Sequence, residues 1–195
     1  MRAVAAALRA NALRLAALDL AVGDGDLGAT AKRIAATLAS YAETTREADL
    51  GKLLAQAGIA VHRAVPSTMG ALVAIALVRA GQPVLGKQTA GPEDLSRMLA
   101  AADAGLQARG RARLGDKTLI DATQPAAEAF AAAIAAGATL PDATVKMTAA
   151  ARAGRDGVTG RRSRVGRASW YGARSAGKED PGATLALVVL EALAG

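Results

Sequence analysis

Three aspartates near the N-terminus form the stretch of the chain best suited to chemistry. Asp19, Asp24 and Asp26 fall within eight residues, and only glycines and apolar residues separate them. Asp24 and Asp26 stand two residues apart in a turn, so their carboxylates can converge, and Asp19 can turn toward them from the preceding helical pattern. Converging carboxylates are costly unless a cation neutralises them. The three carboxylates therefore suit a hard cation that prefers oxygen ligands, Mg²⁺ or Ca²⁺.

The acidic turn has two other interpretations. A bare Asp-Gly-Asp is more often a plain turn between two helices than a metal site. An EF-hand is excluded, because the twelfth loop position counted from Asp24 is Ala35 and not the required Glu.

A second stretch, Ser67 to Gly70, follows Pro66 and opens a helical pattern. The free N–H groups at the start of a helix form a natural phosphate cradle. A simple Ser/Thr cap explains the same residues equally well.

Basic residues concentrate near the C-terminus of a chain whose net charge is +7, with eight of the 24 Lys and Arg between Arg152 and Lys178. This segment could close over a phosphorylated ligand, although a disordered basic loop is the common alternative. Only Trp170 and Tyr171 interleave the basic residues, so we expect no nucleic-acid partner. The single histidine, His62, is predicted to be a partly exposed helix residue. Ser-His-Asp catalysis is therefore poorly supported. Glycine fingerprints of P-loop and Rossmann sites are absent.

The elements that position these stretches are helices. The chain has 195 residues, 52% of them hydrophobic and four aromatic, and its Ala and Leu favour closely packed helices. With no cysteine there is no disulfide or zinc–thiolate site. No apolar run reaches the roughly 18 residues of a membrane span, and the start is too short for a secretion signal. We expect one domain over residues 1–195, with no membrane contact and a cytoplasmic location.

Periodicity predicts about eight helices and no strand, hence an all-α up-and-down helical barrel or bundle. The first should bury Leu8, Leu13, Leu15, Leu18 and Val22 on one side, and the fourth, apolar nearly all round, should be central. Asp49 is expected to cap the third, and Pro92 and Pro125 to lie in the first turns of the fifth and sixth. Residues 154–181 show no period. The expected ranges are 3–21, 27–43, 49–63, 71–79, 92–108, 120–136, 143–153 and 183–193.

Helix parity predicts that the unusual loops meet. Loops after alternate helices of an up-and-down bundle share one end. The loops 23–28, 66–70, 110–118 and 160–182 follow the first, third, fifth and seventh helices, so all four should build one composite site.

Three ordered blocks carry a family resemblance. They are the acidic turn, then Gly115-Asp116-Lys117-Thr118-Leu119-Ile120-Asp121-Ala122, then Gly166 to Ser175 followed by Asp180-Pro181-Gly182-Ala183. Together they resemble the L subunit of dihydroxyacetone kinase. The resemblance implies an eight-helix barrel with the nucleotide site at one end, holding ADP or ATP with Mg²⁺. The metal ligands so implied are Asp19, Asp24 and Asp26. The nucleotide-binding residues so implied are Leu27, Gly28, Ala29, Thr30, Ser67, Thr68, Met69, Gly70, Gly110, Leu119, Arg167, Asp180, Pro181 and Gly182.

The chain departs from the family at two places. The family usually has His where Leu27 stands, and Gly-Gly-(Thr/Ala)-Ser-Gly where this chain has residues 66–70. Met69 therefore replaces a hydroxyl, which removes a phosphate hydrogen bond of about 1 kcal/mol.

As a function, the resemblance implies a phosphoryl-transfer subunit with no catalytic base of its own. It would pass phosphate to a ketose held on a separate K subunit, with ADP recharged by a phosphotransferase-system M subunit or with ATP consumed. We expect a homodimer or a hetero-oligomer. A non-catalytic nucleotide-binding regulatory module of the same family is the alternative, and a fatty-acid kinase head domain is a weaker one.

Overall fold

The computed structural model describes residues 1–195 and contains helices but no strands. The α-helices are α1 (Arg2–Ala10), α2 (Ala12–Leu20), α3 (Leu27–Thr44), α4 (Leu50–Ala64), α5 (Thr68–Gly81), α6 (Pro92–Gly110), α7 (Ile120–Ala135), α8 (Leu140–Gly157) and α9 (Pro181–Ala194). Two 3₁₀ helices, η1 (Gln82–Val84) and η2 (Arg167–Ser175), lie in the connections. The predicted all-α fold is confirmed, and no helix is long and apolar enough to cross a membrane.

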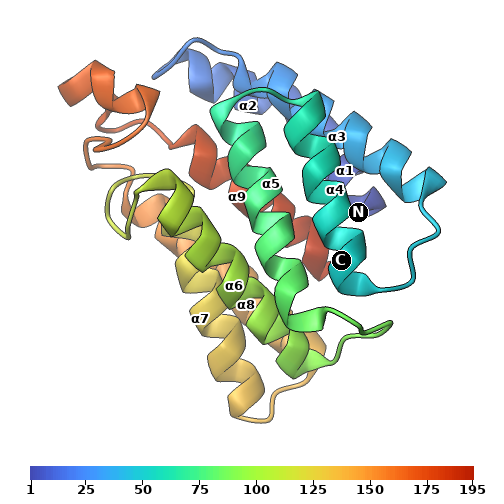
Figure 1. Cartoon of the computed structure of the whole chain (residues 1–195). Coiled ribbons are helices and arrows are strands. Elements are labelled where there is room, and N and C mark those ends of the chain that lie inside the picture. The colour runs from blue at the N-terminus through green and yellow to red at the C-terminus, as the bar shows by residue number, and fades with distance from the viewer.

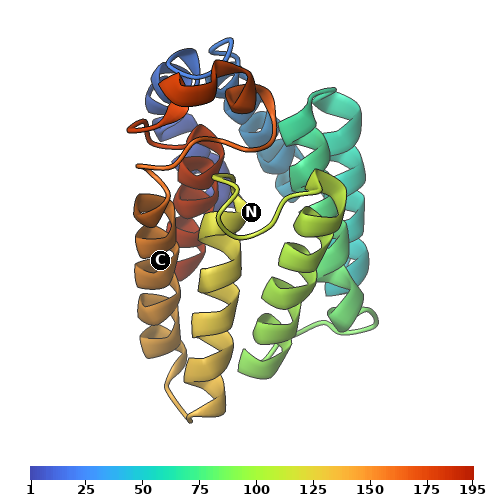
Figure 2. The same ribbon diagram turned by 90° about the vertical axis from the view of Figure 1, so that its left-hand side faces the viewer.

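Successive helices run up and down, so the connections gather at two ends (Figures 1 and 2). Figure 2 shows the α5–α6 and α7–α8 connections at the bottom, and the acidic turn and the segment around η2 at the top. The parity argument therefore holds, because α1 and α2 together occupy the place of one predicted helix.

The first predicted helix is broken at Asn11, which corrects the expected range 3–21. Asn11 has φ −93° and ψ 2°, and its side-chain amide donates to the carbonyl of Ala7 at 2.9 Å. Such local side-chain bonds compete with helix continuation. The break changes the register of α2, so Leu13 is 81% exposed while Leu15 is buried. The expected continuous apolar side through Leu13 is thus wrong.

The central helix is α9 and not α5, which corrects a second expectation. Eight of the 14 residues of α9 are buried. Leu185 and Val188 belong to the core formed mainly by α1, α3 and α4, whereas Ala186 and Leu187 belong to the core formed mainly by α7 and α8. Helix α5 lies between α4 and α6, and most of its apolar side chains are only partly buried. The apolar surface on all sides of α5 therefore reflects its contacts with α4 and α6 and does not indicate a central position.

Two of the three predicted features of helix starts are confirmed. Asp49 accepts a hydrogen bond from the N–H of Lys52, and Pro92 opens α6, as predicted. Pro125 is the sixth residue of α7 and lies inside the helix, not in its first turn. There it removes a donor to the carbonyl of Asp121, against which Gly154 of α8 packs so closely that a Cβ would overlap that oxygen.

The C-terminal segment is more regular than predicted. Helix α8 continues to Gly157, and Arg167–Ser175 forms two short 3₁₀ turns joined at Gly172, whose φ is +53°. Short 3₁₀ turns leave no long hydrophobic period, so the sequence pattern could not reveal them.

Candidate functional site

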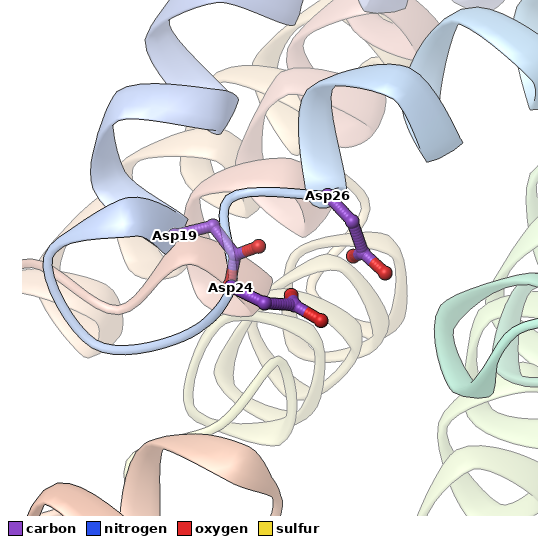
Figure 3. A group of neighbouring side chains, drawn as sticks. All are labelled: Asp19, Asp24 and Asp26. Atoms are coloured by element: carbon purple, nitrogen blue, oxygen red, sulfur yellow. The ribbon is translucent and has the colours of Figure 1, made fainter.

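The acidic turn joins α2 to α3 and brings its three carboxylates together (Figure 3). Oxygen atoms of Asp19, Asp24 and Asp26 all lie within 4.8 Å of one another. A carboxylate oxygen of Asp19 accepts a hydrogen bond from the N–H of Leu27 at 3.1 Å, which fixes Asp19 against the start of α3. Asp24 and Asp26 are about half exposed, at 52% and 49%. The predicted convergence is therefore present.

Glycines make this convergence possible. A Cβ on Gly23 would lie 2.5 Å from a carboxylate oxygen of Asp19, so only glycine leaves that oxygen room. Gly25, between the other two aspartates, has φ +77°, a conformation that glycine adopts without strain. The turn is thus shaped by the same glycines that made its sequence conspicuous.

The counter-charge at this turn comes from the other end of the chain. Arg167, the first residue of η2, forms ion pairs with Asp24 and with Asp26, the latter at 3.3 Å. The hydroxyl of Tyr171 donates to the carbonyl of Gly23 at 2.8 Å. Residues 159–177, which we call the lid, therefore reach across the acidic turn.

The donor set fits a hard divalent cation. Three carboxylates bring a charge of about −3, and one guanidinium offsets only part of it. Oxygen ligands that leave room for water and for other oxygen donors are what Mg²⁺ prefers. Asp19, Asp24 and Asp26 are the residues that would hold it.

Facing the acidic turn, the start of α5 presents backbone donors. The hydroxyl of Ser67 accepts the N–H of Gly70 at 3.0 Å, so the predicted cap is present. The N–H groups of Thr68 and Met69, at the first two positions of α5, have no acceptor within the helix. Together with the positive end of the helix dipole, they suit an anion.

A cleft of about 620 Å³ lies between these elements. The cleft is lined by residues from all four loops that helix parity predicted to meet, among them Asp26, Thr68, Gly110 and Arg167. Its full lining is Asp26, His62, Val65, Pro66, Ser67, Thr68, Ala71, Leu72, Arg109, Gly110 and Arg167. The cleft therefore has acidic, basic and apolar walls, the mixture that a nucleotide with bound metal requires.

Several predicted residues pack together around the start of α9 and do not line the cleft. A Cβ on Gly182 would lie 3.6 Å from both the backbone nitrogen of Leu119 and Cε of Met69. Pro181 is buried at the start of α9, and Asp180 caps that helix by accepting the N–H of Ala183 at 2.7 Å. Burial raises the pKa of the Asp180 carboxyl from its usual 3.8 to about 7.

Other predicted residues do not line the cleft. Leu27 and Thr30 are buried, and Gly28 packs against Ala16 of α2. Ala29 is exposed but does not line the cleft, and Gly70 is buried against Val65. The structure does not bring these five to the cleft as side chains.

Met69 is likewise packed against both hydrophobic cores, outside the lining of the cleft. The two positions where the chain departs from the family pattern, 27 and 69, are thus occupied by side chains that serve the core.

Sequence reasoning missed two charged or titratable residues of the cleft. His62 is exposed in the last turn of α4 and lines the cleft, although it was assigned only a surface role. Arg109 lies beside the predicted Gly110 at the end of α6. Their nearness to the loops at positions 66–70 and 110–118 was the available signal.

Comparison with known proteins agrees with this geometry. Residues 21–195 match the family model described as the DAK2 domain. The chain is similar to the PEP-dependent dihydroxyacetone kinase, ADP-binding subunit DhaL, of Escherichia coli, with 29% identity over 92% of this chain and 86% of that protein. It is also similar to human triokinase/FMN cyclase, with 32% identity over 92% of this chain but only 31% of that protein.

A solved structure extends the similarity to three dimensions. The dihydroxyacetone kinase of C. freundii in its native form superposes with a TM-score of 0.76 and 30% identity, covering 99% of this chain and 33% of that one. The same kinase in complex with AMP-PNP and Mg²⁺ superposes with a TM-score of 0.72.

Proposed function

The chain belongs to the DAK2-domain family of dihydroxyacetone kinases, and from that premise we propose that it is an ADP- or ATP-binding phosphoryl-transfer subunit. Phosphate would pass to a ketose held on a separate K-type subunit, and residues 1–195 would act as one nucleotide-binding domain. The observation that carries the proposal is the cleft, where an acidic cation site, a helix N-terminus and Arg167 face one ligand volume. The partner, with or without a phosphotransferase-system M subunit, is proposed from the similarity to ADP-binding subunits.

The residues of the cleft have complementary tasks. The N–H groups of Thr68 and Met69 would bind phosphate oxygens at the start of α5, and Leu72 and Val65 would offer apolar surface to the base. Mg²⁺, when bound by the three aspartates, would neutralise phosphate charge during transfer. The chain supplies binding and orientation, so we propose no general base on it.

Arg167 would exchange partners when ligand arrives. In this structure it pairs with Asp24 and Asp26 and lines the same cleft. A divalent cation on these carboxylates would repel the guanidinium, and nucleotide phosphates would attract it within the same reach. Arginine suits this task, because it stays charged and pairs bidentately with oxyanions.

The deciding experiment measures phosphate transfer to dihydroxyacetone by this chain mixed with a K-type subunit, once with ATP and once with ADP and a phosphotransferase donor. We expect transfer with one donor and none in the Asp24→Asn variant, and calorimetry should show Mg²⁺ binding tightly only with nucleotide. Nucleotide binding with no transfer under either condition would contradict the kinase proposal.

That outcome would support the second candidate, a non-catalytic nucleotide-binding module. A specific observation favours it: Leu27 and Met69 pack in the core and offer the cleft neither an imidazole nor a hydroxyl.

A further inference from the structure

A buried lysine lies outside the cleft and has no part in the chemistry described so far. Lys117, in the connection between α6 and α7, is 2% exposed and has φ +62°. Its ammonium donates to the carbonyls of Thr159 at 2.8 Å, Arg161 at 3.0 Å and Ser175 at 2.7 Å. An ammonium has three N–H groups, so these three bonds use all of its donors.

The three carbonyls belong to the two ends of the lid. Thr159 and Arg161 follow α8, whereas Ser175 is the last residue of η2. The same two ends are joined by a bond from the N–H of Gly177 to the carbonyl of Thr159 at 2.9 Å, and by one from the N–H of Ser163 to the hydroxyl of Ser175 at 3.0 Å. We call the place where the two ends of the lid meet its neck, and Lys117 lies at the centre of the neck.

The lid beyond the neck has little of its own to hold it. Between Ser163 and Ser175 its apolar contact with the core is limited to Val165, which is only partly buried, and Trp170 is 81% exposed. Its contacts with the rest of the molecule include Arg167 on the acidic turn and Tyr171 on Gly23. Closing the ends of a loop reduces the conformations open to its middle. The position of Arg167 therefore depends on whether the neck is closed.

Burying a charge for this purpose is costly, which argues for a specific task. Desolvation lowers the pKa of Lys117, and the nearby carboxylate of Asp180 opposes that shift. An apolar side chain of equal length would avoid the desolvation cost but would take one donor from each of the three carbonyls. Those of Thr159 and Ser175 would keep the backbone N–H groups of Gly177 and Lys178, whereas that of Arg161 would lose its ammonium partner. The backbone N–H of Arg164 also donates to the carbonyl of Asp116 at 3.0 Å, so the α6–α7 connection holds the lid at a further point.

We propose that Lys117 is a positioning residue, which closes the neck of the lid so that Arg167 is held over the acidic turn and can reach the phosphates of a bound nucleotide. The part that concerns the nucleotide rests on the proposed function, whereas the closed neck does not.

The first test needs no nucleotide. We compare cleavage by an arginine-specific protease of the parent, Lys117→Met and the control Lys178→Met, which changes an exposed lysine directly after the lid. Cleavage between residues 161 and 174 should be on the order of tenfold faster in Lys117→Met than in the parent, and unchanged in the control. Equal rates in parent and Lys117→Met would overturn the proposal.

The second test asks whether Lys117 acts through Arg167. ADP–Mg²⁺ affinity is measured by calorimetry for Lys117→Met, Arg167→Ala and the double variant. Each single change should weaken binding about tenfold, or about 1.4 kcal/mol, and the double change should cost no more than the larger single one. Fully additive losses would show that Lys117 acts independently of Arg167. If the parent itself bound no ADP–Mg²⁺, the proposed function would fail, and the protease test alone would decide on the neck.

Chemical rescue separates positioning from general stability. The chain has no cysteine, so Lys117→Cys places a single thiol that can be alkylated in the unfolded protein before refolding. Bromoethylamine restores an ammonium at nearly the length of lysine, whereas iodoacetamide leaves a neutral amide. Slow lid cleavage with the first and fast cleavage with the second, in folded protein, supports the proposal. Refolding of only the ammonium form would assign Lys117 to the stability of the whole fold and overturn it.

Discussion

Two acidic clusters of this protein differ in where the partners of their carboxylates come from. In the acidic turn, Asp24 and Asp26 are half exposed, and their one cationic partner comes from the lid. At the start of α7, Asp121 is fully buried and accepts the N–H groups of Gly115 at 2.6 Å and Thr118 at 2.7 Å, which belong to the connection between α6 and α7. Each cluster lies in one of the family blocks of the sequence, yet one is open to a ligand and the other is completed by the protein.

The contrast shows how to tell a site from its scaffold. Buried polar groups in native proteins have partners, and losing one is expensive. Exposed carboxylates that converge with too little counter-charge keep free capacity for an external cation. The scaffold cluster should therefore govern stability, and the acidic turn should govern ligand binding.

The largest expected effect is on stability at the scaffold. Asp121→Ala removes the acceptor of two N–H groups in a buried loop, and should lower the free energy of unfolding by about 3 kcal/mol. Urea denaturation measures it, with Asp24→Ala as the matched loss of an acidic side chain, expected within about 0.5 kcal/mol of the parent. Equal losses in the two variants would erase the distinction between site and scaffold.

The converse effect is expected on ligand binding. Asp24→Asn should remove the stabilisation by ADP–Mg²⁺, which is about 2.7 kcal/mol at a ligand concentration 100 times its Kd. Thermal unfolding with and without ligand measures it. Glu43→Gln makes the same charge change in the last turn of α3 and should leave the ligand effect intact. A shift retained in Asp24→Asn would exclude this residue from the cation site.

The free energy of unfolding should also depend on pH through the buried carboxyl of Asp180. Its pKa is raised by burial to about 7 in the folded state from the usual 3.8, so between these values the folded protein holds more protons than the unfolded chain. The free energy of unfolding should therefore fall as the pH rises from about 4 to about 7, by at most about 1.4 kcal/mol per pH unit. Asp180→Asn keeps an acceptor for the cap and should lose this slope. Parallel pH profiles of the two proteins would contradict the assignment.

The smallest expected effect is on stability at the acidic turn. Arg167→Ala breaks two exposed ion pairs and should change the free energy of unfolding by less than about 1 kcal/mol. The same change should strengthen binding of Mg²⁺ alone, because the cation no longer competes with a guanidinium for Asp24 and Asp26. Calorimetry with Mg²⁺ measures it, and Arg174→Ala, an exposed arginine over the ring of Tyr171, is the control. Mg²⁺ binding that is unchanged or weaker in Arg167→Ala would argue against exchange of partners.

Local pattern was sufficient for much of the fold. The 3.6-residue periodicity, the cap at Asp49 and the opening Pro92 predicted helices close to where they lie. The convergence of Asp19, Asp24 and Asp26 followed from their spacing and the glycines between them. Parity then brought four loops to one cleft without any knowledge of contacts.

Periodicity failed where a single polar contact or a neighbour from elsewhere in the chain decided the structure. The break at Asn11 and the exposure of Leu13 depend on a single side-chain bond that does not alter the apolar count. The importance of His62 depends on the cleft it faces.

The sequence by itself determined the helical class, the acidic turn and the family of this protein, because these depend on residues close together in the chain. Tertiary structure alone decided which side chains face the core and which face the cleft. It placed Leu27 and Met69 in the core, and it surrounded Lys117 with three carbonyls that lie 42 to 58 residues away in the chain. The physical reason is that a buried polar group is defined by its partners, and those partners become neighbours only when the helices pack.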